Sequence, residues 1–191
     1  NTTMNMDRLV IKQILGNEQV TQYYVVSLIG KTLVLLIAPI NTIVISYLTK
    51  RKERLTRSQF GKAVLAGGGV SLAFFVACQI GTPLFVWLFY RNLYESVKGI
   101  VTVVNLAQIL GLFSAFLFIL VLTFTDERWQ LWIQLAHFCI LLVSSVLAAR
   151  TYGMMGFAVA SLGANSLRVA AVVILGIVKA GKDKGDRNAD R

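Results

Sequence analysis

The sequence predicts an all-α integral membrane protein, a six-helix transmembrane bundle whose first helix is incomplete, and three observations predict it. First, 56% of the 191 residues are hydrophobic, 15% are charged and the mean hydropathy is +0.68, outside the range of soluble domains. Second, several apolar runs reach the length of about 20 residues that crosses a bilayer as a helix, without the alternation of barrel strands. Third, the basic block KRKERLTR directly follows one of these runs.

The start of the chain is predicted to be an incomplete span. Residues 1–16 contain too few apolar side chains to cross a bilayer alone, so we interpret them as the second half of a helix. We therefore expect the chain to be the C-terminal part of a longer protein. Residues 16–19 are expected to form a turn, and residues 20–48 form the second span, which ends at the basic block.

The third span is expected over residues 62–90, because no charge lies between Lys62 and Arg91. Its length exceeds a minimal crossing, which predicts tilt, a kink at Pro83 or an end in the interface. The remaining spans are expected over residues 99–125, 129–149 and 153–178. These spans form one domain, residues 1–180, and the polar tail 181–191 is expected to be disordered and cytoplasmic.

The distribution of the cations predicts the orientation. If the basic block is cytoplasmic, most of the 19 Lys and Arg fall on the cytoplasmic side, as the positive-inside rule requires. The C-terminus is then cytoplasmic as well. The formal net charge of +10 therefore indicates contact with anionic lipid headgroups, and we exclude nucleic acid as a partner.

Small residues predict where helices pack. Gly69, Ala73, Ala77 and Gly81 recur every fourth residue on the third span, and Gly156, Ala160 and Ala164 do so on the last. Such stripes let helix backbones approach closely. We interpret the run Gly67, Gly68 and Gly69 as part of this packing rather than as a bend.

Charged residues within the spans are the functional candidates, because they usually face a cavity or a partner. Lys31 and Arg168 are both cationic, which favours an anionic ligand. Arg168 either faces a cavity or extends to the cytoplasmic interface, and for Lys31 we favour the cavity over the outer headgroups. Asp7 is either an ion-coupling site or one end of a structural salt bridge, and Arg8, its neighbour, points about 100° away from it.

Uncharged polar side chains add further candidates. Asn165 lies one turn before Arg168, while Asn105 and Gln108 lie one turn apart and either contact a sugar or hydrogen-bond between helices. The interhelical interpretation is favoured for these amides. His137, one turn after Gln134, is expected to be a hydrogen-bonded interior histidine.

No pattern predicts an enzyme, a metal site or a cofactor. The sequence has no HExxH, GxSxG or P-loop motif. The adjacent acids Asp126 and Glu127 fall in a tight turn. Cys78 and Cys139 are far apart in the sequence and are expected to be small packing residues.

Two stretches carry a resemblance to a known family. NMDRLVIKQILGNEQVTQYYVVSLIGKTLVLLIAPINTIVISYLTK, with Asp7, the Leu15-Gly16 turn, Tyr23 or Tyr24 and the basic loop 50–57, resembles the seventh and eighth helices of polysaccharide flippases. TYGMMGFAVASLGANSLRVAAVVILG, with its Tyr-Gly-x-x-Gly turn, resembles their last pair of helices. These flippases belong to the multidrug/oligosaccharidyl-lipid/polysaccharide exporter superfamily.

The resemblance implies that the chain is one lobe of a presumed twelve-helix transporter, preceded by an N-terminal lobe of the same chain. It implies a multi-pass protein of the bacterial cytoplasmic membrane that moves a lipid-linked anionic oligosaccharide by alternating access. Arg8, Lys31 and Arg168 would then contact the headgroup, and Asp7 would be a site for ion coupling.

Two alternatives remain open. A multidrug or cation antiporter of the same superfamily would place acidic residues in its cavity, where this chain offers Asp7 against three cations within the spans. A non-transporting membrane scaffold subunit would fold alone and would have no central basic cavity.

Overall fold

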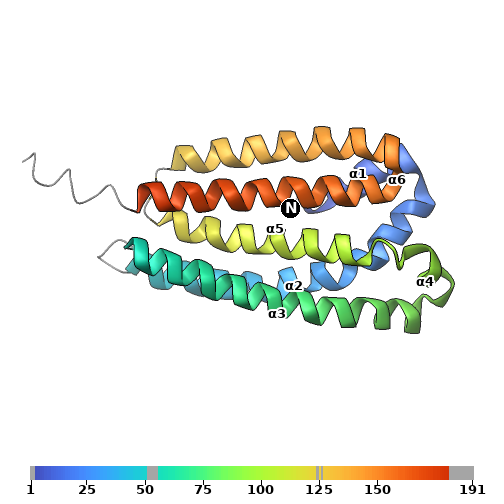
Figure 1. The fold of residues 1–191 in the computed structure, drawn as a ribbon, viewed down its shortest axis with the longest axis horizontal. Coiled ribbons are helices and arrows are strands. Elements are labelled where there is room, and N and C mark those ends of the chain that lie inside the picture. The colour runs from blue at the N-terminus through green and yellow to red at the C-terminus, as the bar shows by residue number, and fades with distance from the viewer. Residues whose placement is uncertain (1–2, 51–55, 124, 126, 181–191) are drawn as a thin grey trace, which may run out of the picture.

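The fold was analysed in a computed structural model that describes residues 3–50, 56–123, 125 and 127–180. The described residues form helices and connecting turns, with no strand among them, so the all-α prediction is confirmed (Figure 1). The helices are α1 (Thr3–Leu15), α2 (Asn17–Lys50), α3 (Arg57–Phe89), α4 (Arg91–Val97), α5 (Val101–Leu122) and α6 (Glu127–Lys179).

Three helices in the described part of the chain are long and apolar enough to cross a membrane. They are Arg57–Phe89, Val101–Leu122 and Leu131–Lys179. Length and composition thus support the membrane class, because a helix satisfies its own backbone hydrogen bonds in hydrocarbon. The tail 181–191, expected to be disordered, lies outside the described residues.

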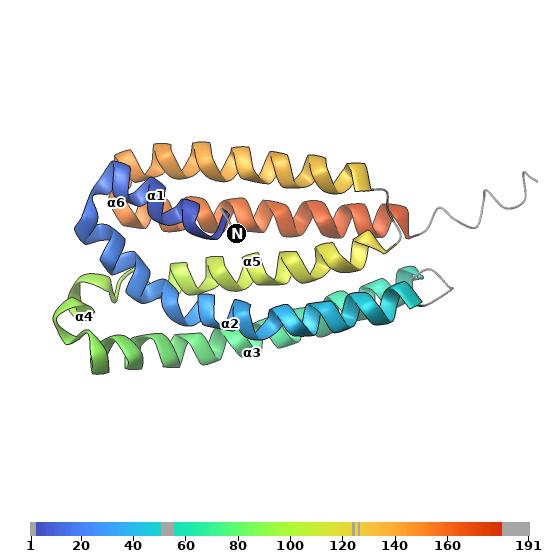
Figure 2. The ribbon, with the colours of Figure 1, turned by 180° about the vertical axis from the view of Figure 1, so that it is seen from behind.

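Helix α6 is a hairpin of two helical limbs that turns at Gly153. This residue has φ 61° and ψ −145°, a conformation that favours glycine, and it falls where the sequence separates its last two expected spans. The limbs run antiparallel and side by side, orange and red in Figures 1 and 2. They approach closely at Gly156, where a Cβ atom would lie 2.1 Å from the carbonyl oxygen of Ala148.

A second positive-φ glycine, Gly16 with φ 95°, separates α1 from α2. The expected turn over residues 16–19 is shorter in the structure, because α2 already begins at Asn17. Helix α1 packs against both α2 and α6 (Figure 2). The turn at Gly16 therefore brings the start of the chain alongside the hairpin that ends it.

Helix α5 lies at the centre of the bundle, between α3 and the α6 limbs in both views, and it packs against α2, α3 and α6. Buried side chains near its two ends belong to two separate hydrophobic clusters. The first cluster contains Val101 and Val104, and the second contains Leu117 and Val121. The positions between them, residues 107–115, border the cavity described below.

The structure corrects the expected packing of α3. Ala73 and Ala77 are exposed, and a Cβ atom at Gly69 or Gly81 would meet no other atom within 4 Å. Helix α3 instead buries Phe60, Cys78, Thr82 and Val86, which lie on another face. The stripe on this helix therefore does not mediate packing within the described chain.

The other small-residue predictions agree with the structure in part, because Gly69 has no neighbour and Ala160 is only half-buried. A Cβ atom at Gly67 would lie 2.8 Å from Phe116 of α5, so this glycine permits a close contact. On α6, Gly156 and Ala164 are buried. Helix α4 was not expected from the sequence, and it carries the exposed ion pair between Glu95 and Lys98.

Candidate functional site

A cavity of about 450 Å³ lies between the two hydrophobic clusters, bordered by α1, α2, α5 and both limbs of α6. Its volume is within the range of about 300–1,000 Å³ that is usual for small-molecule sites. Most of its lining surface belongs to apolar atoms, although many of the lining residues are polar. The polar side chains that line it are Asp7, Tyr23, Lys31, Gln108, Gln134, His137, Ser145, Ser161, Asn165 and Arg168.

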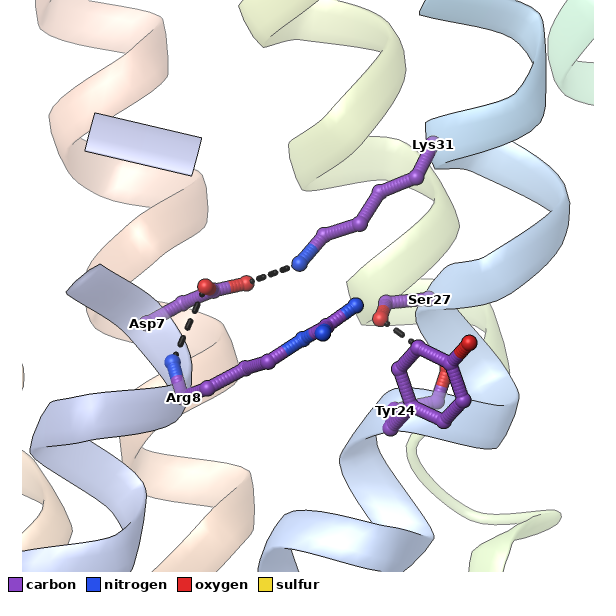
Figure 3. A network of polar contacts seen from close by, with 5 residues as sticks. All are labelled: Asp7, Arg8, Tyr24, Ser27 and Lys31. Carbon is purple, nitrogen blue, oxygen red and sulfur yellow. Dashed lines mark hydrogen bonds and ion pairs between the residues drawn. The ribbon is translucent and has the colours of Figure 1, made fainter. Parts of the chain in front are cut away.

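An ion pair forms one part of the lining. Lys31 Nζ lies 2.6 Å from Asp7 Oδ2, which joins α2 to α1 across the Gly16 turn (Figure 3). The two side chains are only 24% and 19% exposed. The sequence analysis considered Asp7 and Lys31 separately, and the structure pairs them. Of the two interpretations offered for Asp7, an ion-coupling site or a salt bridge, the structure shows the salt bridge.

Arg8 does not line the cavity. Its guanidinium carbon lies 4.2 Å from the centroid of the Tyr24 ring, and its side chain extends toward Tyr24 in Figure 3. The Arg8 backbone N–H donates to Asp7 Oδ1 at 2.9 Å. Arg8 was expected to contact a headgroup with Lys31, but it is not a lining residue, because neighbouring side chains on a helix diverge by about 100°.

Arg168 lines the cavity from the second limb of α6. Its Nη2 donates to Gln134 Oε1 on the first limb at 2.9 Å, and its guanidinium carbon lies 5.4 Å from the Phe118 ring centroid. Among the described residues, no carboxylate pairs with it. The guanidinium therefore lies across the hairpin and contributes an uncompensated positive charge to the cavity.

His137 and Asn165 bridge the hairpin one turn further along. His137 Nε2 lies 3.1 Å from Asn165 Oδ1, and Asn165 Nδ2 donates to the Ala107 carbonyl at 2.8 Å. Because the amide nitrogen of Asn165 is the donor to Ala107, its oxygen is the acceptor from His137. The interior, hydrogen-bonded histidine predicted from the sequence is confirmed, and Asn165 lines the cavity with both amide atoms engaged in protein hydrogen bonds.

The two amides of α5 take different positions. Asn105 is buried in the contact with α3, where its Nδ2 donates to the Cys78 carbonyl and to Gln79 Oε1, and its Oδ1 accepts from Thr82. The favoured interhelical interpretation therefore holds for Asn105, which is not a cavity residue. Gln108 does line the cavity, and neither atom of its amide has a hydrogen-bond partner in the described structure.

Sequence reasoning missed Tyr23, Ser145 and Ser161 as cavity residues. A periodic signal was present, since Gln134, His137 and Ser145 follow one face of the first limb. On the second limb the face carries Ser161, Asn165 and Arg168, at intervals of four and three residues. Sparse polar residues at helical spacing on an otherwise apolar span thus indicated the cavity walls.

The described residues contain no group of three His, Cys, Asp or Glu side chains that could hold a metal ion. No protein-family model, curated protein or solved structure matches this chain. The residues of the cavity are therefore the basis for assigning a function.

Proposed function

We propose that this chain is one lobe of a transporter that moves a lipid-linked anionic oligosaccharide across a bacterial cytoplasmic membrane, for surface polysaccharide biosynthesis. The observation that carries the proposal is Arg168, a cation without a carboxylate partner among the described residues, in a cavity bordered by apolar helices. A charge in such surroundings is costly and usually marks a substrate pathway. An anionic ligand offsets that cost, and a guanidinium fits the oxygens of a phosphate bidentately.

The charge balance of the cavity supports an anion. Lys31 is paired with Asp7, so the described lining retains one net positive charge, at Arg168. In the proposed cycle, ion coupling acts through Asp7. Binding of the coupling ion at this carboxylate weakens its ion pair with Lys31, whose ammonium can then also contact the substrate phosphate.

The proposed lobe comprises residues 1–180 and works against an N-terminal lobe by alternating access, with the C-terminus in the cytoplasm. The cation distribution along the chain supports this orientation. The resemblance of the two quoted stretches to polysaccharide flippases supports the choice of substrate. Neither a cofactor nor a catalytic residue enters the proposal.

An antiporter for cationic drugs is the main competing class, and the ion pair argues against it. Asp7 is the acidic side chain among the lining residues, and its Oδ2 is bonded to Lys31. A cationic substrate would have to displace this lysine, and it would then share the cavity with Arg168. A scaffold subunit gives no reason for a cavity that contains a partly buried cation without a carboxylate partner among the described residues.

The test is export of the glycan by the full-length protein carrying Arg168→Ala or Lys31→Ala. We expect loss of surface polysaccharide with normal membrane insertion. Arg150→Ala is the matched control, because Arg150 is an exposed cation of the same helix and does not line the cavity. Normal surface polysaccharide in both cavity variants would contradict the proposal, and loss of cationic-dye efflux in its place would identify the antiporter.

A further inference from the structure

The end of the bundle where α3 begins and α6 ends is strongly basic. Residues 50–62, 126–128 and 179 contain eight Lys and Arg against three Asp and Glu. Four of these cations have described side chains: Arg57, Lys62, Arg128 and Lys179. The first three are exposed and the last is half-buried. None of the four forms an ion pair with a described carboxylate, and none lines the cavity, so this charge is separate from that of the cavity.

Each helical segment that reaches this basic end changes from charged to apolar within about one turn. Exposed apolar side chains begin at Leu65 on α3 and at Leu131 on the first limb of α6, and they end at Val178, beside Lys179, on the second limb. Trp129, 46% exposed, lies at the same change on the first limb. Such a change, with Trp beside Lys and Arg, is typical of the boundary between hydrocarbon and lipid headgroups.

Arg57, the first residue of α3, is held at this boundary by α6. Its Nε donates to the carbonyl oxygen of Ile177 at 2.9 Å. This carbonyl belongs to the last turn of α6, where helix geometry leaves carbonyl groups without an intrahelical partner. Arg57 is exposed, and its two Nη nitrogens form no hydrogen bond with described residues. The guanidinium is therefore held by one nitrogen, which leaves two for the oxygens of an anionic group.

Lys179 lies at the same level of the bundle as Arg57. Helix α3 and the second limb of α6 run antiparallel (Figure 1), and they meet where a Cβ atom at Gly176 would lie 2.2 Å from the Phe60 ring. Arg57 lies three residues before Phe60, and Lys179 lies three residues after Gly176. Both cations are therefore one helical turn beyond this contact, toward the basic end. The Lys179 ammonium lies 5.6 Å from the centroid of the Trp129 ring.

An exposed apolar stripe leads away from Arg57 along the second limb of α6. Its members recur at intervals of three and four residues, which places them on one face of the helix: Leu167, Ala170, Ile174 and Ile177. Ile177, at the end of the stripe, is the residue whose carbonyl accepts from Arg57. At 1.5 Å per residue the stripe is about 15 Å long, half of the hydrocarbon core of about 30 Å. It therefore matches the depth of one leaflet.

We propose that Arg57 and Lys179 bind the headgroup of an anionic phospholipid, whose acyl chain lies along the stripe from Leu167 to Ile177. The cations match the charge of the headgroup phosphate, and the stripe matches the length of a chain in one leaflet. A soluble phosphate would leave the stripe uncovered. The cytoplasmic leaflet, which is rich in anionic lipid, is the source, a step that rests on the orientation given in the proposed function. This lipid lies on the outside of the bundle, and the substrate lies in the cavity.

The experiment titrates the full-length protein in detergent with phosphatidylglycerol and with phosphatidylcholine of the same chains, and native mass spectrometry measures the affinity of each. We expect phosphatidylglycerol to bind about tenfold or more tightly, since each cation near a headgroup contributes about fivefold. Arg57→Gln should lower this preference by about fivefold. Lys179→Gln should do the same, and it keeps the test valid if Arg57→Gln fails to fold. A purely structural role of Arg57 would change the binding of both lipids equally and leave the preference intact.

The control is Arg91→Gln, at an exposed arginine that lies 5.7 Å from the Trp87 ring at the opposite end of the bundle (Figure 1). We expect it to keep the preference for phosphatidylglycerol. An equal loss in the control, no preference in the parent protein, or full competition by glycerol phosphate would overturn the lipid site. The two proposals fail separately. A preference that depends on Arg57 while export does not depend on Arg168 or Lys31 would overturn the flippase and keep the lipid site, and the reverse result would do the opposite.

Discussion

Asn105 and Gln108 are carboxamides three residues apart on α5, and they lie in opposite environments. Asn105 is fully buried against α3 and has partners for its oxygen and its nitrogen, in Thr82, Cys78 and Gln79. Gln108 lies about 60° away around the helix and lines the cavity, and its amide atoms are buried and unpartnered in the described structure. The Asn105 amide joins two helices, whereas the Gln108 amide is packed against the backbone of α2 at Gly30 and has no hydrogen-bond partner among the described residues.

The difference separates a polar group that joins two helices from one that has no hydrogen-bond partner among the described residues. Both residues are carboxamides on adjacent turns of one helix, but Asn105 is fully buried and Gln108 is half-buried. The count of satisfied hydrogen bonds separates their amide groups most clearly. The predictions below therefore measure the free energy of unfolding after substitution of Asn105 and of Gln108. The last one measures the melting temperature after substitution in an exposed ion pair.

The largest effect is expected at Asn105. Asn105→Ala removes the shared partner of Thr82 and Gln79 and leaves polar groups unsatisfied in the α3–α5 contact. The free energy of unfolding should fall by about 1–3 kcal/mol. Unfolding of the full-length protein in mixed detergent micelles measures this change, and an unchanged free energy would remove the distinction between the two amides.

A smaller effect, of the opposite sign, is expected at Gln108. Gln108→Leu replaces an unpartnered amide with an apolar side chain of similar size, so the free energy of unfolding should stay constant or rise by up to about 1 kcal/mol. The same micelle titration measures it. A loss of stability comparable to that of Asn105→Ala would mean that Gln108 has partners in the folded protein.

The smallest effect is expected at the Glu95–Lys98 pair, where both side chains are exposed. The hydrogen bond to Glu95 and its charge raise the pKa of Lys98. A lysine whose pKa is raised on folding stabilises the folded state. This stabilisation is complete below the pKa of the unfolded state, about 10.4, and is lost as the pH rises through the pKa of the folded state. Glu95→Gln should therefore leave the melting temperature unchanged between pH 5 and 8, because exposed ion pairs contribute little.

The helical class and the hairpin were predictable because they depend on local features. Long apolar runs specify helices, and Gly153 marks the turn between two of them. The stripe from Gly69 to Gly81 wrongly predicted a packing face of α3. Small residues permit the close approach of another helix, but they do not determine which helix packs there. Helix α4 was missed because seven residues of mixed polarity carry no periodic signal.

The cavity was predictable in its charges but not in its hydrogen bonds. Asp7, Lys31 and Arg168 stand out in apolar spans, and all three line it. The ion pair joins residues 24 positions apart, which the sequence does not relate. Asn105 and Gln108 have the same chemistry, so only the positions of α3 and α2 beside α5 separate their roles.

The turn at Gly153 has a consequence for the wall of the cavity around Arg168. Two side-chain hydrogen bonds in this wall, Arg168 to Gln134 and His137 to Asn165, connect the two limbs of one hairpin. The Arg168 guanidinium is thus oriented by contacts within one hairpin, and the hydrogen bond from Asn165 to the Ala107 carbonyl joins this hairpin to α5.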